Sequence, residues 1–182
     1  MAHGLLRERG MANSIEQLET KTMGTAHAIK AGFNGLRGVF LHLAEEHGEV
    51  SALIKRVAKS SDAGVRREHY PLIRAELLTH ERAELTEVYS VLSKYPETRG
   101  LSLAHNQEAE QLEDAIARID ALDFASSEWP IAFERLVSLV QNHVREEEEE
   151  FFPRAQQVLS EDESKSLLAR YEAARAAAKR NV

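Results

Sequence analysis

The sequence predicts an all-α protein that folds as an up-and-down antiparallel four-helix bundle with one additional helix at each end. Three observations lead to this prediction. Apolar residues recur at helical spacing along four long segments. These segments lack the alternating Val, Ile and Thr residues and the Asn-Gly or Asp-Gly pairs that are typical of strands and hairpins. The connections between the segments are short, which favours antiparallel neighbours.

The first two bundle helices are predicted over residues 36–59 and 71–94. In the first, apolar residues follow one another at alternating steps of four and three, which is the period of one buried helical face. A polar break at residues 60–64 separates the two helices. Pro71 suits the first turn of the second helix, because an N–H group has no helical partner there. This helix is predicted to end at residues 95–98.

The other two bundle helices are predicted over residues 101–122 and from Pro130 onward. One helix precedes the bundle at residues 14–33, and another follows it at residues 161–179. The last of these is expected to start with a capping box formed by Ser160 and Glu163.

The chain is predicted to form one domain over residues 14–182, with its core bundle at about residues 36–158, after a disordered start at residues 1–13. Close packing of the N-terminal helix against a neighbour is predicted by three small residues, Ala28, Gly32 and Gly35. A second subunit in a homodimer is one candidate for that neighbour.

Composition narrows the function of the 182-residue chain. It has no cysteine, which excludes disulfides, thiolate zinc sites, iron–sulfur clusters and cysteine nucleophiles. The formal net charge is -7, and no basic stripe is present that would follow a phosphate backbone, so we expect no nucleic-acid partner. No segment approaches the ~20 apolar residues of a membrane span, and the start lacks the apolar core of a secretory signal. A cytoplasmic protein without a membrane partner is predicted.

One histidine interrupts the apolar face of each predicted bundle helix: His47, His80, His105 and His143. A single histidine on such a face is most often a hydrogen-bonded core residue. Two of the four, however, are followed on the same face by a glutamate four residues later, Glu84 and Glu147. Burial of a carboxylate without a partner costs several kcal/mol. A cation between these side chains is therefore predicted.

The pattern His-x-x-x-Glu occurs three times, whereas about one occurrence is expected by chance from this composition. The third pair, His42 and Glu46, lies beside the apolar stripe and is interpreted as a solvated surface pair. His27 and His69 have no acidic residue four positions later and are interpreted as structural or incidental. In the acidic run, a solvated face is predicted for three residues, Glu146, Glu148 and Glu149. Glu150 is predicted to contact a side chain that binds the cation, without binding the cation itself.

The two halves of the bundle resemble each other, because each has a helix with one histidine followed by a helix with His-x-x-x-Glu. The segments HERAELTEVYS and HVREEEEEFFP place aromatic Tyr89 and Phe152 at the same distance after the histidine. Two related half-sites predict two metal ions. Imidazole and carboxylate ligands without thiolate suit iron, manganese or zinc, and open octahedral positions favour iron or manganese.

The pattern resembles the hemerythrin-like (HHE cation-binding) family over about residues 36–158. The resemblance rests on EEHGEVSALI, LLTHERAELTEVY, LAHNQEAEQL and VQNHVREEEEEFFP. It implies an up-and-down four-helix bundle around two oxo- or hydroxo-bridged non-haem iron ions rather than manganese or zinc. The metal ligands that it implies are His47, His80, Glu84, His105, His143 and Glu147.

The sequence departs from invertebrate hemerythrin, the oxygen carrier, at one ligand. That protein has a second histidine four residues after the one on the third helix, and Ala109 stands there in this chain. Glu108 is a candidate substitute for this metal ligand. Alternatively, Glu108 forms a hydrogen bond with a residue that binds the metal and does not bind the metal itself. The remaining order is similar to that of mycobacterial hemerythrin-like proteins, a branch associated with peroxide handling. Reversible dioxygen transport is thus disfavoured.

Two functions follow as the main alternatives. The first is a di-iron protein that binds and reacts with hydrogen peroxide or dioxygen, with catalase-like disproportionation as its candidate enzymatic activity. The second is a non-enzymatic module that senses or stores dioxygen, nitric oxide or iron. A third is a bundle whose histidines are hydrogen-bonded without a metal. The usual ferritin-like oxidase is excluded, because no histidine has a glutamate three residues before it.

Overall fold

The computed structural model describes the backbone of residues 2–180, and their side chains except those of residues 2–13, 15 and 16. The elements, in chain order, are α1 (Ala2–Phe33), α2 (Val39–Ala58), α3 (Ala63–Ala83), the π-helical turn η1 (Glu84–Tyr89), α4 (Ser90–Leu92), α5 (Pro96–Asp120), α6 (Glu128–Glu146), the π-helical turn η2 (Glu147–Phe151), α7 (Phe152–Val158) and α8 (Glu161–Ala178).

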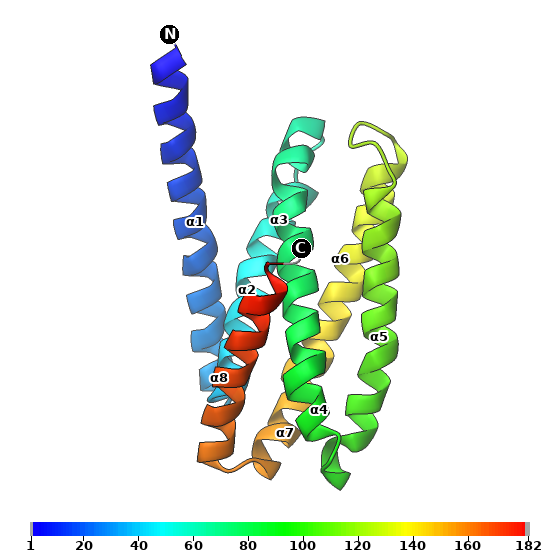
Figure 1. Cartoon of the computed structure of the whole chain (residues 1–182). Coiled ribbons are helices and arrows are strands. Elements are labelled where there is room, and N and C mark those ends of the chain that lie inside the picture. The colour runs from blue at the N-terminus through cyan, green and yellow to red at the C-terminus, as the bar shows by residue number, and fades with distance from the viewer. Residues whose placement is uncertain (1, 181–182) are drawn as a thin grey trace.

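The bundle consists of four columns that run alternately up and down: α2, then α3 with η1 and α4, then α5, then α6 with η2 and α7 (Figure 1). Helix α1 packs along α2, and α8 turns back along α3 and η1. The described residues form no strand. The all-α fold with an additional helix at each end is confirmed. The prediction of a disordered start at residues 1–13 stays a prediction, because their side chains lie outside the described residues.

The starts of two bundle helices lie earlier than the sequence predicted. The carboxylate of Asp62 accepts a hydrogen bond from the backbone N–H of Gly64 at 2.7 Å, and this cap starts α3 at Ala63. Pro71 is therefore inside the helix, and its placement in the first turn was wrong. Helix α5 begins at Pro96, where proline does occupy the first turn. At the C-terminal helix, the capping box of Ser160 and Glu163 is confirmed.

The apolar core has two parts, one towards each end of the bundle. One contains residues 50–57 of α2 and packs them against the far ends of α3, α5 and α6. The other contains residues 39–44 and packs them against η1, α7 and α8. Trp129 and Phe133 belong to the first part and Phe151 and Phe152 to the second. Between the two parts, each column carries a layer of buried histidine and glutamate side chains.

Helices α1 and α2 approach closely where Gly24 faces Gly48. A Cβ atom on Gly48 would lie 2.5 Å from Cβ of His27 and 2.9 Å from Cα of Gly24. Of the small residues predicted to pack closely, Gly32 faces Leu41 of α2, 3.6 Å from where its Cβ would lie, whereas a Cβ on Gly35 would meet nothing within 4 Å. The close crossing thus lies at Gly24 rather than at these residues, and a homodimer stays a prediction.

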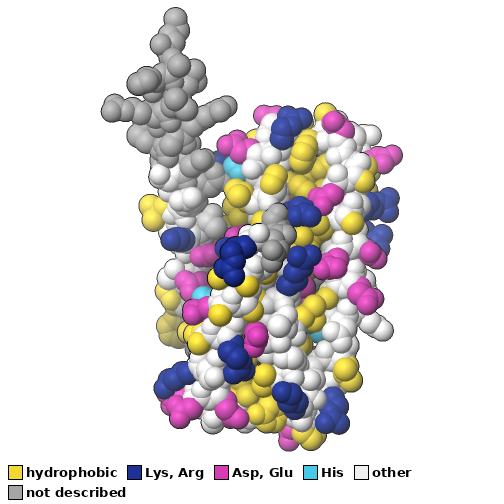
Figure 2. Space-filling view, in the orientation of Figure 1, with side chains coloured by type: hydrophobic (Ala, Val, Ile, Leu, Met, Phe, Trp, Pro, Cys, Tyr) yellow, Lys and Arg dark blue, Asp and Glu magenta, His cyan; other side chains and the backbone are white. Residues whose placement is uncertain are grey.

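The surface drawn in Figure 2 intermingles basic and acidic side chains rather than gathering one sign in a stripe. Within the described part of the chain, no helix combines the length and the apolar composition that a membrane span needs.

We expect Gly48→Ala to lower the free energy of unfolding by about 1–3 kcal/mol, because the added methyl group must push α1 and α2 apart. Denaturant titration followed by circular dichroism measures the change. Gly100→Ala is the control, since a Cβ at Gly100 meets nothing within 4 Å, and the lower backbone entropy of alanine should stabilise α5 by about 0.5–1 kcal/mol. Equal effects of the two substitutions would contradict the close crossing.

Candidate metal centre

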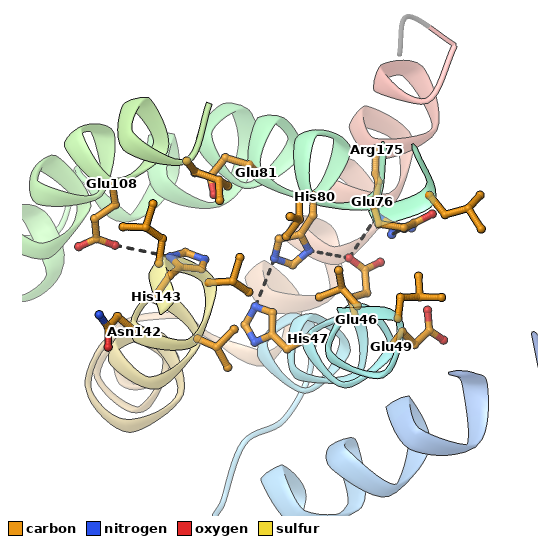
Figure 3. Close-up of a pocket in the computed structure, with 18 of the residues that line it drawn as sticks. Glu46, His47, Glu49, Glu76, His80, Glu81, Glu108, Asn142, His143 and Arg175 are labelled. Carbon is orange, nitrogen blue, oxygen red and sulfur yellow. Dashed lines mark hydrogen bonds and ion pairs between the residues drawn. The ribbon is translucent and has the colours of Figure 1, made fainter. Parts of the chain in front are cut away.

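The four histidines predicted from the sequence meet in the polar layer at the middle of the bundle. His47, His80 and His105 are buried, and His143 is half-buried. The ring centroids of His47 and His80 are 5.0 Å apart, and those of His105 and His143 are also 5.0 Å apart. Figure 3 shows His47, His80 and His143 pointing towards one another from three different columns.

The two glutamates of the His-x-x-x-Glu pairs each begin a π-helical turn. Glu84 starts η1 directly after α3, and Glu147 starts η2 directly after α6. A π-helical turn widens the helix by one residue and is frequent at functional sites. The same irregularity at the same position in both halves supports the internal repeat read from the sequence. These turns were not predicted from the sequence, although the buried residues step by four through each of them: Glu84, Val88 and Leu92 in one, and Glu147, Phe151 and Ala155 in the other.

Each histidine directs its Nδ1 atom outward to a carboxylate. Nδ1 of His47 lies 2.9 Å from Glu148, and Nδ1 of His80 lies 2.8 Å from Glu46. Glu108 serves the other two rings, 3.5 Å from Nδ1 of His143 and 3.7 Å from Nδ1 of His105. A carboxylate at Nδ1 fixes the ring orientation and leaves Nε2 with its lone pair facing inward.

The Nε2 atoms accordingly converge inside the layer. Nε2 of His47 is 3.2 Å from Nε2 of His80 and 3.2 Å from a carboxylate oxygen of Glu147. Nε2 of His143 is 3.2 Å from the same oxygen of Glu147. When both Nδ1 atoms donate to carboxylates, two Nε2 lone pairs face each other at this distance. Such an arrangement repels unless a proton or a metal ion lies between the atoms.

Two buried carboxylates in the layer have oxygens without a hydrogen-bond donor. Glu84 is 0% exposed, and neither of its oxygens accepts a hydrogen bond, although one lies 3.1 Å from Nε2 of His80. One oxygen of Glu147 is likewise without a donor. An ionised carboxylate is stable in such surroundings only beside a cation. The residues therefore fit a bound metal.

Among the described residues, three overlapping groups place their ligand atoms within 4.8 Å of one another. The groups are His47, His80, His143 and Glu147; Glu81, His105 and His143; and Glu84, His105 and Glu147. All six predicted site residues occur in them. Because the groups share members, they offer positions for more than one ion. Their roles as ligands stay predictions.

Sequence reasoning missed Glu81, which is buried and lies 2.6 Å from Nε2 of His105. It follows His80 directly, so the search for glutamate at the fourth position passed over it. Glu108 lies on the outer side of His105 and His143, next to their Nδ1 atoms. This position suits a residue that orients the two histidines by hydrogen bonding better than a residue that replaces the missing metal ligand.

Three interpretations of acidic residues from the sequence were wrong. Glu148 does not belong to a solvated face, since it binds His47 and also accepts from Nε2 of His27 at 2.8 Å. Glu46 was interpreted as half of a solvated surface pair with His42, but it is buried, and one of its oxygens contacts Nδ1 of His80. His42 does lie 3.2 Å from the other oxygen. Glu150, expected to contact a ligand, pairs with Arg154 at the surface. An exposed position was inferred for Glu148 and Glu46 because neither residue lies on the apolar stripe of its helix.

The two additional helices support two of these outer carboxylates. From α8, the hydroxyl of Tyr171 donates to Glu46 at 2.5 Å. Nε of Arg175, also from α8, forms an ion pair with Glu46 at 3.1 Å (Figure 3). From α1, His27 reaches Glu148. His27, interpreted from the sequence as structural or incidental, thus contacts a carboxylate that orients His47.

Aromatic rings from each half of the bundle cover a histidine of the other half. Tyr89 of η1 stacks on His105 with ring centroids 3.7 Å apart. Phe152 of α7 lies parallel to His47 at 5.9 Å. The hydroxyl of Tyr89 also donates to Glu147. These contacts limit the rotation of the imidazoles.

The electrostatics of the layer favour charged forms of both partners. Burial lowers the pKa of His105, but Glu108 and Glu81 outweigh it and raise this pKa to about 9. Burial raises the pKa of Glu148, whereas hydrogen bonds with His27 and His47 lower it to about 2. For Glu147, His143 and His47 overcome the effect of burial and hold the pKa well below its usual range. A metal-free layer therefore draws protons onto its histidines, which a bound cation would replace.

Comparison with known proteins gives one match. The family model "Hemerythrin HHE cation binding domain" matches residues 39–155, which is more than half of the chain. No curated protein and no solved structure matches the chain. The matched residues contain every histidine and glutamate of the three overlapping groups, whereas α1 and α8 lie entirely outside them.

We expect Glu46→Gln to weaken metal binding by about 10–100-fold, because an amide holds Nδ1 of His80 less firmly and raises its basicity less than a carboxylate does. Titration with iron or zinc against a competing chelator measures the affinity. The adjacent substitution Glu45→Gln is the control, since the Glu45 side chain bonds to Thr25 instead. Affinities that fall equally in both variants would show that general charge, not the contact with His80, is responsible.

Proposed function

The chain belongs to the hemerythrin HHE cation-binding family, and on this premise we propose that it is a non-haem di-iron protein that binds and reacts with hydrogen peroxide. The family implies iron binding. The proposal adds the number of ions and the reaction. Its main support is the convergence of histidine Nε2 atoms with three carboxylate oxygens that have no hydrogen-bond donor, both of Glu84 and one of Glu147, in a buried layer.

Two ions are supported by the overlap of the three candidate groups. Glu147, His143 and His105 each belong to two of them, and Glu147 shares a group with all four histidines. A carboxylate in that position is suited to bridge two ions. Ligands would come from His47, His80, Glu84, His105, His143 and Glu147, with Glu81 as a further candidate. Imidazole and carboxylate donors without sulfur suit iron.

Reaction with peroxide is supported by an incomplete ligand set and by access. Ala109 is buried and offers no donor where the oxygen carrier has a histidine. A cavity reaches His47, His80 and His143, so a small molecule can enter from the surface. When bound, an iron pair supplies Lewis acidity and a two-electron redox couple.

The chain's own residues would position the peroxide and exclude bulk water. The stacked rings of Tyr89 and Phe152 shield two histidines, and Glu46, Glu108 and Glu148 fix the Nδ1 protons. With these protons held, the histidines present neutral, lone-pair-bearing nitrogens to a metal.

The first test is the metal content of the purified protein and its ultraviolet–visible spectrum. We expect about two irons per chain, in line with two octahedral half-sites, and absorption that Glu147→Ala removes, because Glu147 is common to two groups. Glu149→Ala is the matched control, since Glu149 is exposed on the same turn. Protein that stays free of iron after anaerobic reconstitution would contradict the proposal.

The second test measures oxygen evolution from hydrogen peroxide. We expect the di-iron protein to evolve oxygen faster than free iron at the same concentration, and His80→Ala to reduce this rate by at least about 100-fold through loss of a ligand. A stable, spectroscopically distinct adduct without turnover would instead indicate a non-enzymatic module that senses or stores its ligand.

A further inference from the structure

The cavity beside the histidine layer is much larger than hydrogen peroxide requires. Its volume is about 1030 Å³. A water molecule occupies ~30 Å³ of liquid, and peroxide has only one more oxygen atom. Cavities of ~300–1,000 Å³ with an apolar lining and a few polar groups typically hold organic molecules. The size therefore points to a ligand with an organic body.

The lining of the cavity divides by polarity. Apolar side chains come from α2, α3, α5 and α6: Val50, Leu53, Leu72, Leu77, Leu112, Leu139, Val140 and Val144. His47, His80 and His143 line it as well, and these are candidate metal ligands. An apolar body and a reactive group next to the histidines would thus be accommodated in one space.

The charge of the lining disfavours anions. Seven glutamates line the cavity against three basic side chains, Lys21, Arg175 and Lys179. Arg175 pairs with Glu46 and Glu76, and Lys179 pairs with Glu76, so these charges offset one another and the excess of negative charge lies with the remaining glutamates. Figure 3 shows Glu46, Glu49, Glu76, Glu81 and Glu108 around the space. An uncharged ligand avoids repulsion by this excess of carboxylates.

We propose that the cavity binds neutral organic hydroperoxides with an apolar body, and that these are a substrate class of the site in addition to hydrogen peroxide. The proposal rests on the proposed peroxide reaction. The apolar body would contact the leucine and valine side chains, while the hydroperoxide group would lie at the histidines. A fatty-acid hydroperoxide with a free carboxylate would be disfavoured by the glutamates.

The reaction balances with hydrogen peroxide as the reductant: ROOH + H₂O₂ → ROH + H₂O + O₂. The O–O bond of the organic hydroperoxide breaks, and this molecule takes up two electrons and two protons to give the alcohol and water. Hydrogen peroxide loses the same two electrons and two protons and leaves as dioxygen. No further reductant is needed.

Binding is tested without turnover by calorimetry on the iron-loaded protein. The probe is 2-phenylpropan-2-ol, the alcohol formed from cumene hydroperoxide. We expect saturable binding, and about a tenfold or greater loss of affinity in Leu139→Trp, because an indole fills space that the ligand would occupy. Leu72→Trp, at another part of the lining, is a second variant if Leu139→Trp does not fold. Leu103→Trp is the control, since Leu103 is 58% exposed and does not line the cavity.

Turnover is tested by supplying cumene hydroperoxide together with hydrogen peroxide and quantifying the alcohol. We expect the ratio of cumene hydroperoxide consumption to hydrogen peroxide consumption to fall at least about tenfold in Leu139→Trp and to stay unchanged in Leu103→Trp.

The outcomes separate this proposal from the proposed function. Oxygen evolution from hydrogen peroxide alone, without alcohol formation or binding of the probe, overturns the organic substrate and leaves the peroxide reaction standing. A protein with two irons that consumes neither peroxide overturns both. Equal loss in the Leu103 and Leu139 variants overturns the assignment to this cavity.

Discussion

The fold is organised around charged side chains buried halfway along an apolar bundle. Each of the four columns places histidine or glutamate between two apolar clusters, and the cavity reaches this polar layer from the surface. Burying these groups costs several kcal/mol for each unpartnered charge. The cost is reduced only if every ring and carboxylate has a fixed partner. Much of the remaining structure, including the additional helices, supplies those partners.

The two halves of the bundle satisfy this constraint in related ways. In each, the glutamate of His-x-x-x-Glu opens a π-helical turn, and an aromatic residue after that turn covers a histidine of the other half. The halves differ on the outer side. Glu46 and Glu148 serve one ring each with help from α8 and α1, whereas Glu108 is shared by His105 and His143. Ala109 stands on the same helix as Glu108, so the site is least enclosed by donors on this side.

The sequence predicted what periodicity can encode. The four histidines and two glutamates share buried faces, and apolar spacing of three and four places them there, so the layer and the columns were predictable. The start of α3 was not, because the cap at Asp62 outweighs the preference of Pro71 for a first turn. The π-helical turns, the burial of Glu46 and the partial burial of Glu148 were also missed. Glu46 and Glu148 lie beside the apolar stripes of their helices. They are covered because α8 and α1 pack over them, and the periodicity of a single helix does not reveal this packing.

Helices α1 and α8 lie outside the part of the chain that matches the family, whereas the candidate metal ligands lie inside it. The residues of the candidate metal groups all lie within residues 39–155, so metal binding is a property of the shared domain. The partners of Glu46 and Glu148 in α8 and α1, Tyr171, Arg175 and His27, lie outside it. Hydrogen bonds from such outer residues alter the basicity of the ligands, and with it the affinity and redox potential of a bound metal. The donor set therefore accounts for where a metal would bind, whereas the two flanking helices, which hold His47 and His80 through Glu148 and Glu46, would set how tightly it binds and at what potential.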